Sequence, residues 1–151
     1  MTHNAYTLKP KNLLLPVALL LIFWFTRLPA LESLPLHNDE GLHLSRAVQV
    51  WNLKPFWEIR DGKIINHWVI AALYPQSSPA FIGRIATVLV VMIGVAAGFA
   101  LARREFGVLP AAFVIWMWSF TPYLFFYERL AFSDAEAGAL ALAAIWAALR
   151  L

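Results

Sequence analysis

Long stretches without a charged side chain constrain this sequence more than any other feature. Residues 85–102 and 108–127 contain no Asp, Glu, Lys or Arg. A helix that crosses the hydrocarbon core of a bilayer needs about 20 predominantly apolar residues. Because 61% of the chain is also hydrophobic, we expect an integral membrane protein.

Four segments are long and apolar enough to be transmembrane helices. They are residues 13–31, 82–102, 108–127 and 130–149. We therefore predict an all-α integral membrane fold that forms one domain over residues 1–151. No small-residue cleavage pattern follows the first segment, so we expect a retained span rather than a signal peptide. Arg27 lies near the end of this span, where its side chain is expected to reach the lipid headgroups.

The loop between the first two spans, residues 32–81, is expected to hold helices that lie along the membrane surface. Apolar residues recur at the spacing of one helix face at Leu44, Ala47, Val48 and Trp51. This spacing predicts an amphipathic helix, with Asn38 as its N-terminal cap. The apolar segment 64–74 is too short to cross a bilayer and is followed at once by Pro75, so we expect an interfacial or re-entrant helix there.

Basic residues set the expected orientation of the spans. Lys9 and Lys11 precede the first span, and Arg103 and Arg104 follow the second. Basic residues concentrate on the cytoplasmic side of membrane proteins, and both pairs can lie there only if the short apolar segment does not cross. This topology puts the long first loop and the turn after the third span together on the outer face.

Two acidic clusters lie in these outer segments. The first is Asp39 with Glu40, and the second is Asp134 with Glu136, which point to different faces of one helix. Carboxylates in the first turn of a helix are favoured by the helix dipole alone, by ~0.3–1 kcal/mol. The functional alternative is a general base or a metal ligand. For Asp134, contact with water or a pair with Arg129 competes with a place in a functional cavity.

Other polar residues narrow the range of functions. His37 and His43 flank the first acidic cluster, but no His-Glu-x-x-His pattern or third ligand accompanies them, so we predict no metal site. Lys63 and Arg84 are expected to contact an anionic group, either a lipid headgroup or a substrate phosphate. Scattered basic residues beside apolar segments argue against nucleic-acid binding, and a chain without cysteine forms no disulfide.

The order of the sequence motifs resembles a known membrane family. "RLP" at residues 27–29 is followed by "NDEG", "DGKIINHW", "IGRIATVLVVMIGVAAGFALARREFG" and "TPYLFFYERLAFSDAEAGALALA". This order is similar to the N-terminal part of the membrane-embedded C-type glycosyltransferases (GT-C), in particular the protein O-mannosyltransferases and the bacterial lipid A aminoarabinose transferases. The resemblance covers residues 13–151.

The resemblance implies an inverting glycosyltransferase that takes a sugar from a polyprenyl-phosphate donor. Asp39 would be the general base toward the acceptor, with Glu40 beside it, and Asp134 would be a second acid of the same cavity. The expected substrate-binding residues are Lys63, His67, Arg84 and Arg129. Of these, Lys63 or Arg84 would face the donor phosphate. The acceptor would be a protein, lipid or glycan at the outer, periplasmic face of a bacterial inner membrane. The sequence indicates no cofactor, and participation of a divalent metal ion is left open.

Two departures from the family affect what is expected of the chain. "KIINHW" at residues 63–68 lacks the two prolines that usually follow the family's lysine, and family members have many more spans. We therefore expect either the N-terminal part of such an enzyme or a small protein whose further helices come from a partner chain, in both cases embedded in membrane lipids. The alternative is a non-catalytic accessory or assembly subunit. A small transporter or channel subunit is a weaker alternative, because no convincing charge lies near the middle of a span.

Overall fold

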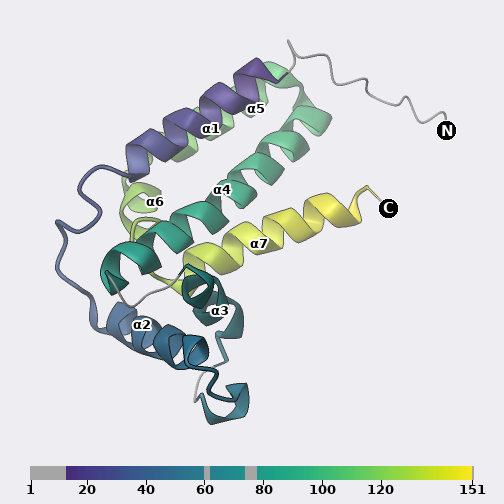
Figure 1. Ribbon diagram of the computed structural model, residues 1–151. Helices are drawn as coiled ribbons and strands as arrows, with labels where there is room; N and C mark the ends of the chain where they lie inside the picture. Colours follow the sequence, from purple (N-terminus) through teal and green to yellow (C-terminus); the bar gives the residue numbers. More distant parts are fainter. Residues whose placement is uncertain (1–12, 60–61, 74–77, 151) are drawn as a thin grey trace.

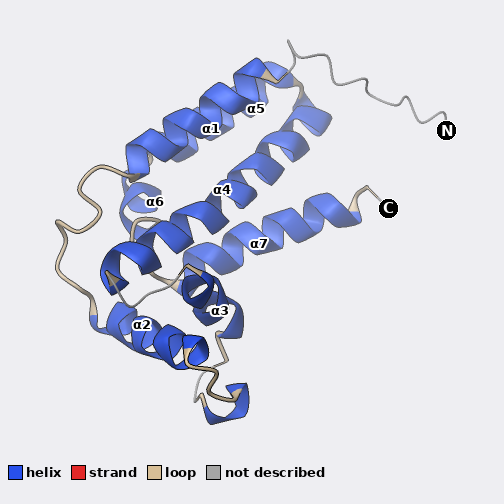
Figure 2. Cartoon of the chain, viewed as in Figure 1, coloured by secondary structure: helices blue, strands red, loops and turns tan. Residues whose placement is uncertain are grey.

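The computed structural model describes residues 13–59, 62–73 and 78–150. Of these residues 78% are helical, and none of them lies in a strand (Figure 2). The predicted all-α class is therefore confirmed for the described part of the chain. Lys9 and Lys11, on which part of the orientation argument rests, lie outside it.

The helices follow one another with short connections, apart from the loop between the first two. They are α1 (Leu14–Arg27), α2 (Asn38–Trp51), the 3-10 helix η2 (Phe56–Glu58), α3 (Ile64–Ala72), α4 (Pro79–Phe106), α5 (Val108–Phe120), α6 (Pro122–Tyr127) and α7 (Ser133–Ala148). Helix α4 lies at the centre and contacts α1, α5 and α7 along the bundle and α2 and α3 at one end (Figure 1).

Helix α4 owes its central place to its composition. Between Arg84 and Arg103 it carries no charge, so every face can pack against a neighbour. Its 28 residues correspond to about 42 Å, which exceeds the roughly 30 Å thickness of a bilayer's hydrocarbon core. Among the described residues, α4 is the one helix long and apolar enough to span a membrane, whereas α1 and α5 are apolar but shorter.

Prolines move the ends of the predicted spans. Helix α1 ends at Arg27, two residues before Pro29. Thr121 is extended, with ψ 118°, and Pro122 then starts a separate helix, because a residue before proline is pushed out of the helical region. The single helix predicted over residues 108–127 is therefore wrong, since α5 and α6 replace it.

The described part of the first loop contains two α-helices, as its pattern predicts, and the short 3-10 helix η2 between them. Helix α2 buries Leu44 and Ala47, and α3 has nine residues, about 14 Å, which cannot cross a bilayer. The predicted cap is wrong: His37 caps α2, and Asn38 is already helical. A neutral imidazole nitrogen accepts a hydrogen bond as a Ser or Asp oxygen does, so the cap lies one residue earlier than predicted.

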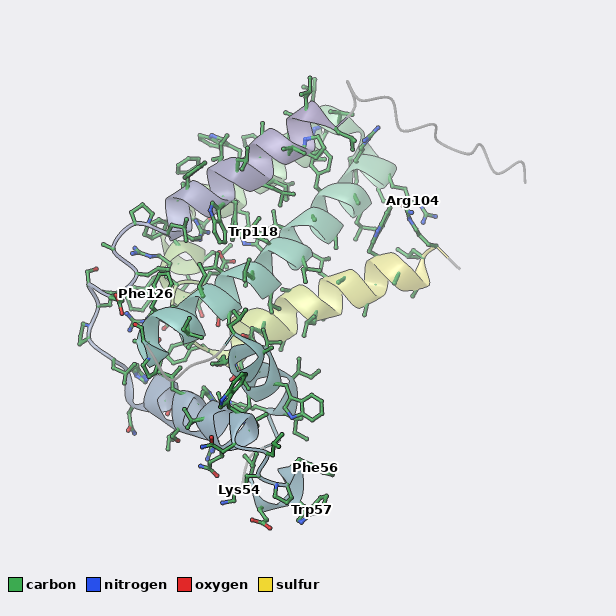
Figure 3. All side chains as sticks on the ribbon, in the orientation of Figure 1. Lys54, Phe56, Trp57, Arg104, Trp118 and Phe126 are labelled. Atoms are coloured by element: carbon green, nitrogen blue, oxygen red, sulfur yellow. The ribbon has the colours of Figure 1, made fainter. Side chains whose placement is uncertain are left out.

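The long helices alternate in direction. In Figure 1, α1 and α5 run toward the end of the bundle where α2 and α3 lie, and α4 and α7 run away from it. Figure 3 shows Arg104 at the end opposite Lys54, Phe56 and Trp57. There Nη1 of Arg104 donates to the carbonyl oxygen of Leu149 at 2.7 Å. We call the end with α2, α3 and the start of α7 the acidic end.

Small residues allow α4 and α7 to approach closely. Ala139 is 2% exposed, and a Cβ added to Gly94 would lie 2.6 Å from both the Cα and the Cβ of Ala139. Small residues at such positions are typical of tightly packed helices in membranes. Ala139 is therefore part of the surface of α7 that packs against α4.

We expect Gly94→Ala to destabilise the protein by about 1–3 kcal/mol, because the new methyl group must push α4 and α7 apart. The matched control is Gly138→Ala, since a Cβ added to Gly138 meets nothing within 4 Å, and it should gain up to about 1 kcal/mol in helix propensity. Thermal unfolding of both variants in detergent tests this, and equal stability of the two would contradict the packing described.

Candidate functional site

The beginnings of α2 and α7 meet at the acidic end of the bundle. Oε1 of Glu40 accepts a hydrogen bond from the backbone N–H of Ala131 at 2.8 Å. The ring of His37 packs edge-on against Phe132, with centroids 5.2 Å apart. The chain segments that carry the two acidic clusters are therefore in direct contact, although about 90 residues separate them in sequence.

A buried ion pair fixes this junction. Nη2 of Arg84 lies 2.8 Å from Oε2 of Glu40, and both side chains are 0% exposed. Nε of Arg84 donates to Oε1 of the same carboxylate at 2.9 Å, so the pair is bidentate. The remaining guanidinium hydrogens bind carbonyl oxygens of the preceding loop, those of Leu31, Leu34 and Pro35. Arg84 thus joins α4, α2 and the loop from α1.

Glu40 also helps to start α2. Its Oε2 accepts from the backbone N–H of His37 at 3.0 Å, while Nδ1 of His37 accepts from the N–H of Asp39 at 3.2 Å, which together form a capping box. Burial alone would raise the pKa of the Glu40 carboxyl. Hydrogen bonds from Arg84 and from the backbone of Ala131 and His37 outweigh burial, so this pKa is below its usual value.

These contacts give Glu40 and Arg84 a structural role. Each satisfies the other, and neither reaches the surface. The resemblance assigns Glu40 a place beside the catalytic base and Arg84 a place at the donor phosphate. The geometry instead commits both side chains to holding α2, α4 and the start of α7 together.

A second buried pair lies at the same end. Nη2 of Arg27 contacts Oε2 of Glu128 at 2.6 Å, and Trp118 donates from Nε1 to the other carboxylate oxygen. Arg27 also donates to the carbonyl oxygen of Ser119. Arg27 is 0% exposed, so the expectation that its side chain reaches the headgroups is wrong, because a partner from the turn after α6 satisfies its charge inside the protein.

A hollow of about 300 Å³ adjoins the junction. Its lining residues are Leu34, Pro35, Leu36, His37, Phe126, Tyr127, Leu130 and Phe132. This volume is at the lower end of the range for ligand pockets. Within this lining the rings of His37 and Phe132 contact each other edge-on. Figure 3 labels Phe126, another of the lining residues. The lining is mostly apolar, with one imidazole and one phenol group.

Asp39 and Asp134 are both exposed and lie two residues after His37 and Phe132, which line the hollow. Each is in the first turn of its helix, α2 or α7. An ion pair between Asp134 and Arg129 was the predicted alternative. In the structure, Nη2 of Arg129 instead donates to the carbonyl oxygens of Pro29 and Ala30.

The remaining predicted substrate-binding residues, Lys63, His67 and Arg129, differ in how far they are exposed. Lys63 is exposed and lies at the residue just before α3, where its side chain makes no capping hydrogen bond. His67 is 1% exposed, and its Nε2 lies 3.2 Å from Nδ1 of His43, so it joins α3 to α2. Arg129 is partly exposed, and its Nε has no hydrogen-bond partner within the described residues. Burial, followed by the positive charges of Arg27 and Arg84, lowers the pKa of Arg129.

His37, His43 and His67 are the histidines in the described part of the chain. Across residues 13–59, 62–73 and 78–150, no group of three His, Cys, Asp or Glu residues is placed to hold a metal ion. His43 and His67 form a buried pair at the contact between α2 and α3.

Sequence reasoning did not find the pairing of Arg27 with Glu128 or the burial of Glu136. The one sequence signal for the pair of Arg27 with Glu128 is that each of these charged residues lies beside an apolar segment. A charge in such a position usually needs an oppositely charged partner. Glu136 lies on the buried face of α7, at 2% exposure, while Asp134 is on the exposed face. The two point to different faces, as their spacing predicts.

Comparisons with protein-family models, with curated protein sequences and with solved structures find no match for this chain. The arrangement at the acidic end is therefore the basis for any functional proposal. Its distinctive features are two exposed carboxylates at the starts of α2 and α7, a small hollow lined mostly by apolar residues and the buried ion pair of Glu40 with Arg84.

Glu40→Gln should lower the free energy of unfolding by about 3 kcal/mol at neutral pH, because it leaves the buried Arg84 charge uncompensated. The neighbouring exposed Asp39 provides the matched control, and Asp39→Asn should cost less than about 1 kcal/mol. Chemical unfolding in detergent measures both. Equal effects of the two substitutions would show that the ion pair is not a structural centre.

The same pair predicts a dependence of stability on pH. Because the folded-state pKa of Glu40 is lowered, its stabilising contribution is complete above the unfolded value of about 4.3 and is lost as the pH falls through the folded value. The stability difference between wild type and Glu40→Gln should therefore be constant near neutral pH and shrink in acid. A difference that grows below about pH 4 would contradict this assignment.

Proposed function

We propose that this chain is the N-terminal part of a membrane glycosyltransferase of the GT-C type. It would transfer a sugar from a polyprenyl-phosphate donor to an acceptor at the outer face of a bacterial inner membrane. The observation that carries the proposal is the contact between the starts of α2 and α7, which brings Asp39 and Asp134 to one end of the bundle beside an apolar hollow.

Exposed apolar side chains on the bundle support a multi-pass membrane location. Leu14 is 72% exposed, Leu109 82% and Phe113 62%, and they belong to α1 and α5, the helices around α4. Extended apolar surface of this kind is costly in water and favourable in lipid. The described lengths of α1, α5 and α7 are shorter than a bilayer core, which a thinner bilayer accommodates at modest cost.

The proposed chemistry assigns one role to Asp39 and another to the cations that face the donor phosphate. The Asp39 carboxylate takes the proton of the acceptor hydroxyl as its oxygen attacks the anomeric carbon. The bond from that carbon to the phosphate oxygen breaks, and the phosphate leaves with the electron pair. Cations stabilise the leaving phosphate. Lys63 and Arg129 are better candidates for this than Arg84 and His67, because they are the members of the predicted set that are not fully buried.

The Asp39→Asn substitution should reduce sugar transfer by a factor of at least about 100, because an amide cannot accept the acceptor's proton. The measurement is transfer from polyprenyl-phosphate mannose and polyprenyl-phosphate aminoarabinose in native membranes that contain the variant. Glu105→Gln serves as the control, since Glu105 is an exposed carboxylate at the opposite end of α4, and it should leave transfer unchanged.

Unchanged transfer by Asp39→Asn, in membranes where the protein is present at its normal level, would overturn the catalytic assignment. A loss of transfer that Glu105→Gln shares would indicate damage to the fold instead. Lys63→Ala and Arg129→Ala should each raise the donor KM more than they lower kcat if these residues bind the phosphate.

The alternative is a non-catalytic accessory or assembly subunit. One observation favours it: Glu40 and Arg84, which the resemblance places at the active site, are committed to each other in the interior. In that case Asp39→Asn would leave transfer intact, while Leu109→Glu on the exposed face of α5 would disrupt association with a larger complex.

A further inference from the structure

The connection between α2 and α3 exposes apolar side chains at the edge of the molecule. Leu53 is 89% exposed, Phe56 53% and Trp57 74%, and Trp68 on α3 is 58% exposed. The rings of Phe56 and Trp57 contact each other edge-on, with centroids 5.2 Å apart. Figure 3 shows Lys54, Phe56 and Trp57 together beyond α3. We call Leu53, Phe56, Trp57 and Trp68 the apex.

Leu53 has a backbone conformation that a leucine rarely adopts. At the end of α2 the N–H of Lys54 donates to the carbonyl oxygen of Gln49, and the N–H of Leu53 donates to that of Val50. This is the Schellman motif, which needs one left-handed residue and usually has glycine there. Leu53 takes that position with φ 59°. A side chain at this position costs free energy, and exposing the leucine to water does not offset the cost. An apolar contact outside the chain would offset it.

The apolar face of α2 is not available for such a contact. Its residues Leu44 and Ala47 are buried in one cluster with Ile70 of α3 and Ala86 of α4. The amphipathic pattern of α2 therefore packs this helix onto the protein itself. The exposed apolar surface of the α2–α3 pair lies instead at the connection, on the apex.

The α2–α3 pair lies at the level of the lipid headgroups if α4 spans the membrane. The 28 residues of α4 correspond to about 42 Å, which matches the roughly 40–45 Å of a bilayer with its headgroup regions. The first turns of α4 then lie among the headgroups. Leu44 of α2 packs on Gly83 in these turns, and Figure 1 shows α2 crossing the end of the bundle rather than extending it. The apex, at the far end of α2, therefore stays near this level.

The side chains of the apex suit this region of a bilayer. Tryptophan is enriched where a membrane meets water, because its ring is apolar and its N–H is polar. Lys54 can keep its ammonium group in water while its stem covers apolar surface. The space beneath the apex has no room for a water molecule, so the apex offers a surface rather than a pocket. The residues around that space are Val50, Phe56, Ile59, Ile64, His67 and Trp68.

We propose that the apex inserts into the headgroup region of the leaflet at the acidic end and anchors the α2–α3 pair there. Lys54 and Glu58 are both exposed and carry opposite charges, so burial of apolar side chains, rather than attraction to anionic lipid, drives the contact. Helix α2 is then held at both ends, by the ion pair of Glu40 with Arg84 at its start and by lipid at its end. This inference rests on the membrane location in the proposed function but not on sugar transfer.

Fluorescent labels on single cysteines test the anchor, because the chain has no cysteine of its own. The full chain with Leu53→Cys or Trp57→Cys is labelled with an NBD maleimide and placed in nanodiscs of neutral phosphatidylcholine. Each label leaves the other apex side chains in place. The nanodiscs are made with and without lipids that carry a nitroxide near the top of the acyl chain. Insertion by about 5–10 Å into the boundary of headgroups and acyl chains should quench about half or more of the emission at both positions.

Two further positions serve as references. Ser45→Cys, on the exposed side of α2, should remain unquenched, whereas Leu109→Cys on α5, which is 82% exposed, should be quenched by lipid. Quenching at residue 109 but not at residues 53 and 57 would overturn the anchor and leave the membrane location standing. No quenching at any of the four positions would overturn both.

Two other outcomes would also overturn the anchor. Equal quenching at residues 45, 53 and 57 would show that lipid contact is not specific to the apex. Emission from residues 53 and 57 that is shifted to the blue but not quenched by the nitroxide lipids would show that protein, such as a second copy of the chain, covers the apex.

Discussion

The carboxylate of Glu40 holds together the part of the molecule on which the other arrangements depend. Its two oxygens bind the guanidinium of Arg84 in α4, the backbone of Ala131 before α7 and the backbone of His37 at the start of α2. A buried ion pair is favourable only when its geometry is good and its remaining hydrogens are satisfied. Both conditions hold here, because Arg84 also binds loop carbonyl oxygens.

The second pair, Arg27 with Glu128, lies at the same end and fastens α1 to the turn after α6. The contacts that join the helices thus differ in kind along the length of the bundle. Polar contacts fix the acidic end, while close apolar packing such as that of Gly94 against Ala139 joins the helices further along. An end of the bundle that two buried ion pairs fix can hold exposed groups such as Asp39 in a defined arrangement.

The sequence predicts the helical class and the two loop helices well, because periodicity and apolar length are local signals. It predicts less about the side chains that join distant segments. Glu40 stands 44 positions from Arg84 and Arg27 stands 101 from Glu128, and no local pattern reports such a partner. Glu40 and Asp39 look alike in sequence, yet one is buried and the other exposed. The break at Thr121 does have a local signal, because Pro122 follows it and a residue before proline is pushed out of the helical region.

Under the proposed function, both acidic helix starts face the outer side of a membrane and the Arg104 end faces the cytoplasm. Because the chain has no cysteine, single substitutions Asp39→Cys, Asp134→Cys and Glu105→Cys allow each position to be labelled alone with a membrane-impermeant maleimide in intact spheroplasts. We expect labelling at the first two positions in intact spheroplasts, and labelling at the third only after permeabilisation. Labelling of Asp39→Cys and Asp134→Cys from opposite sides, or of all three from outside, would contradict this orientation.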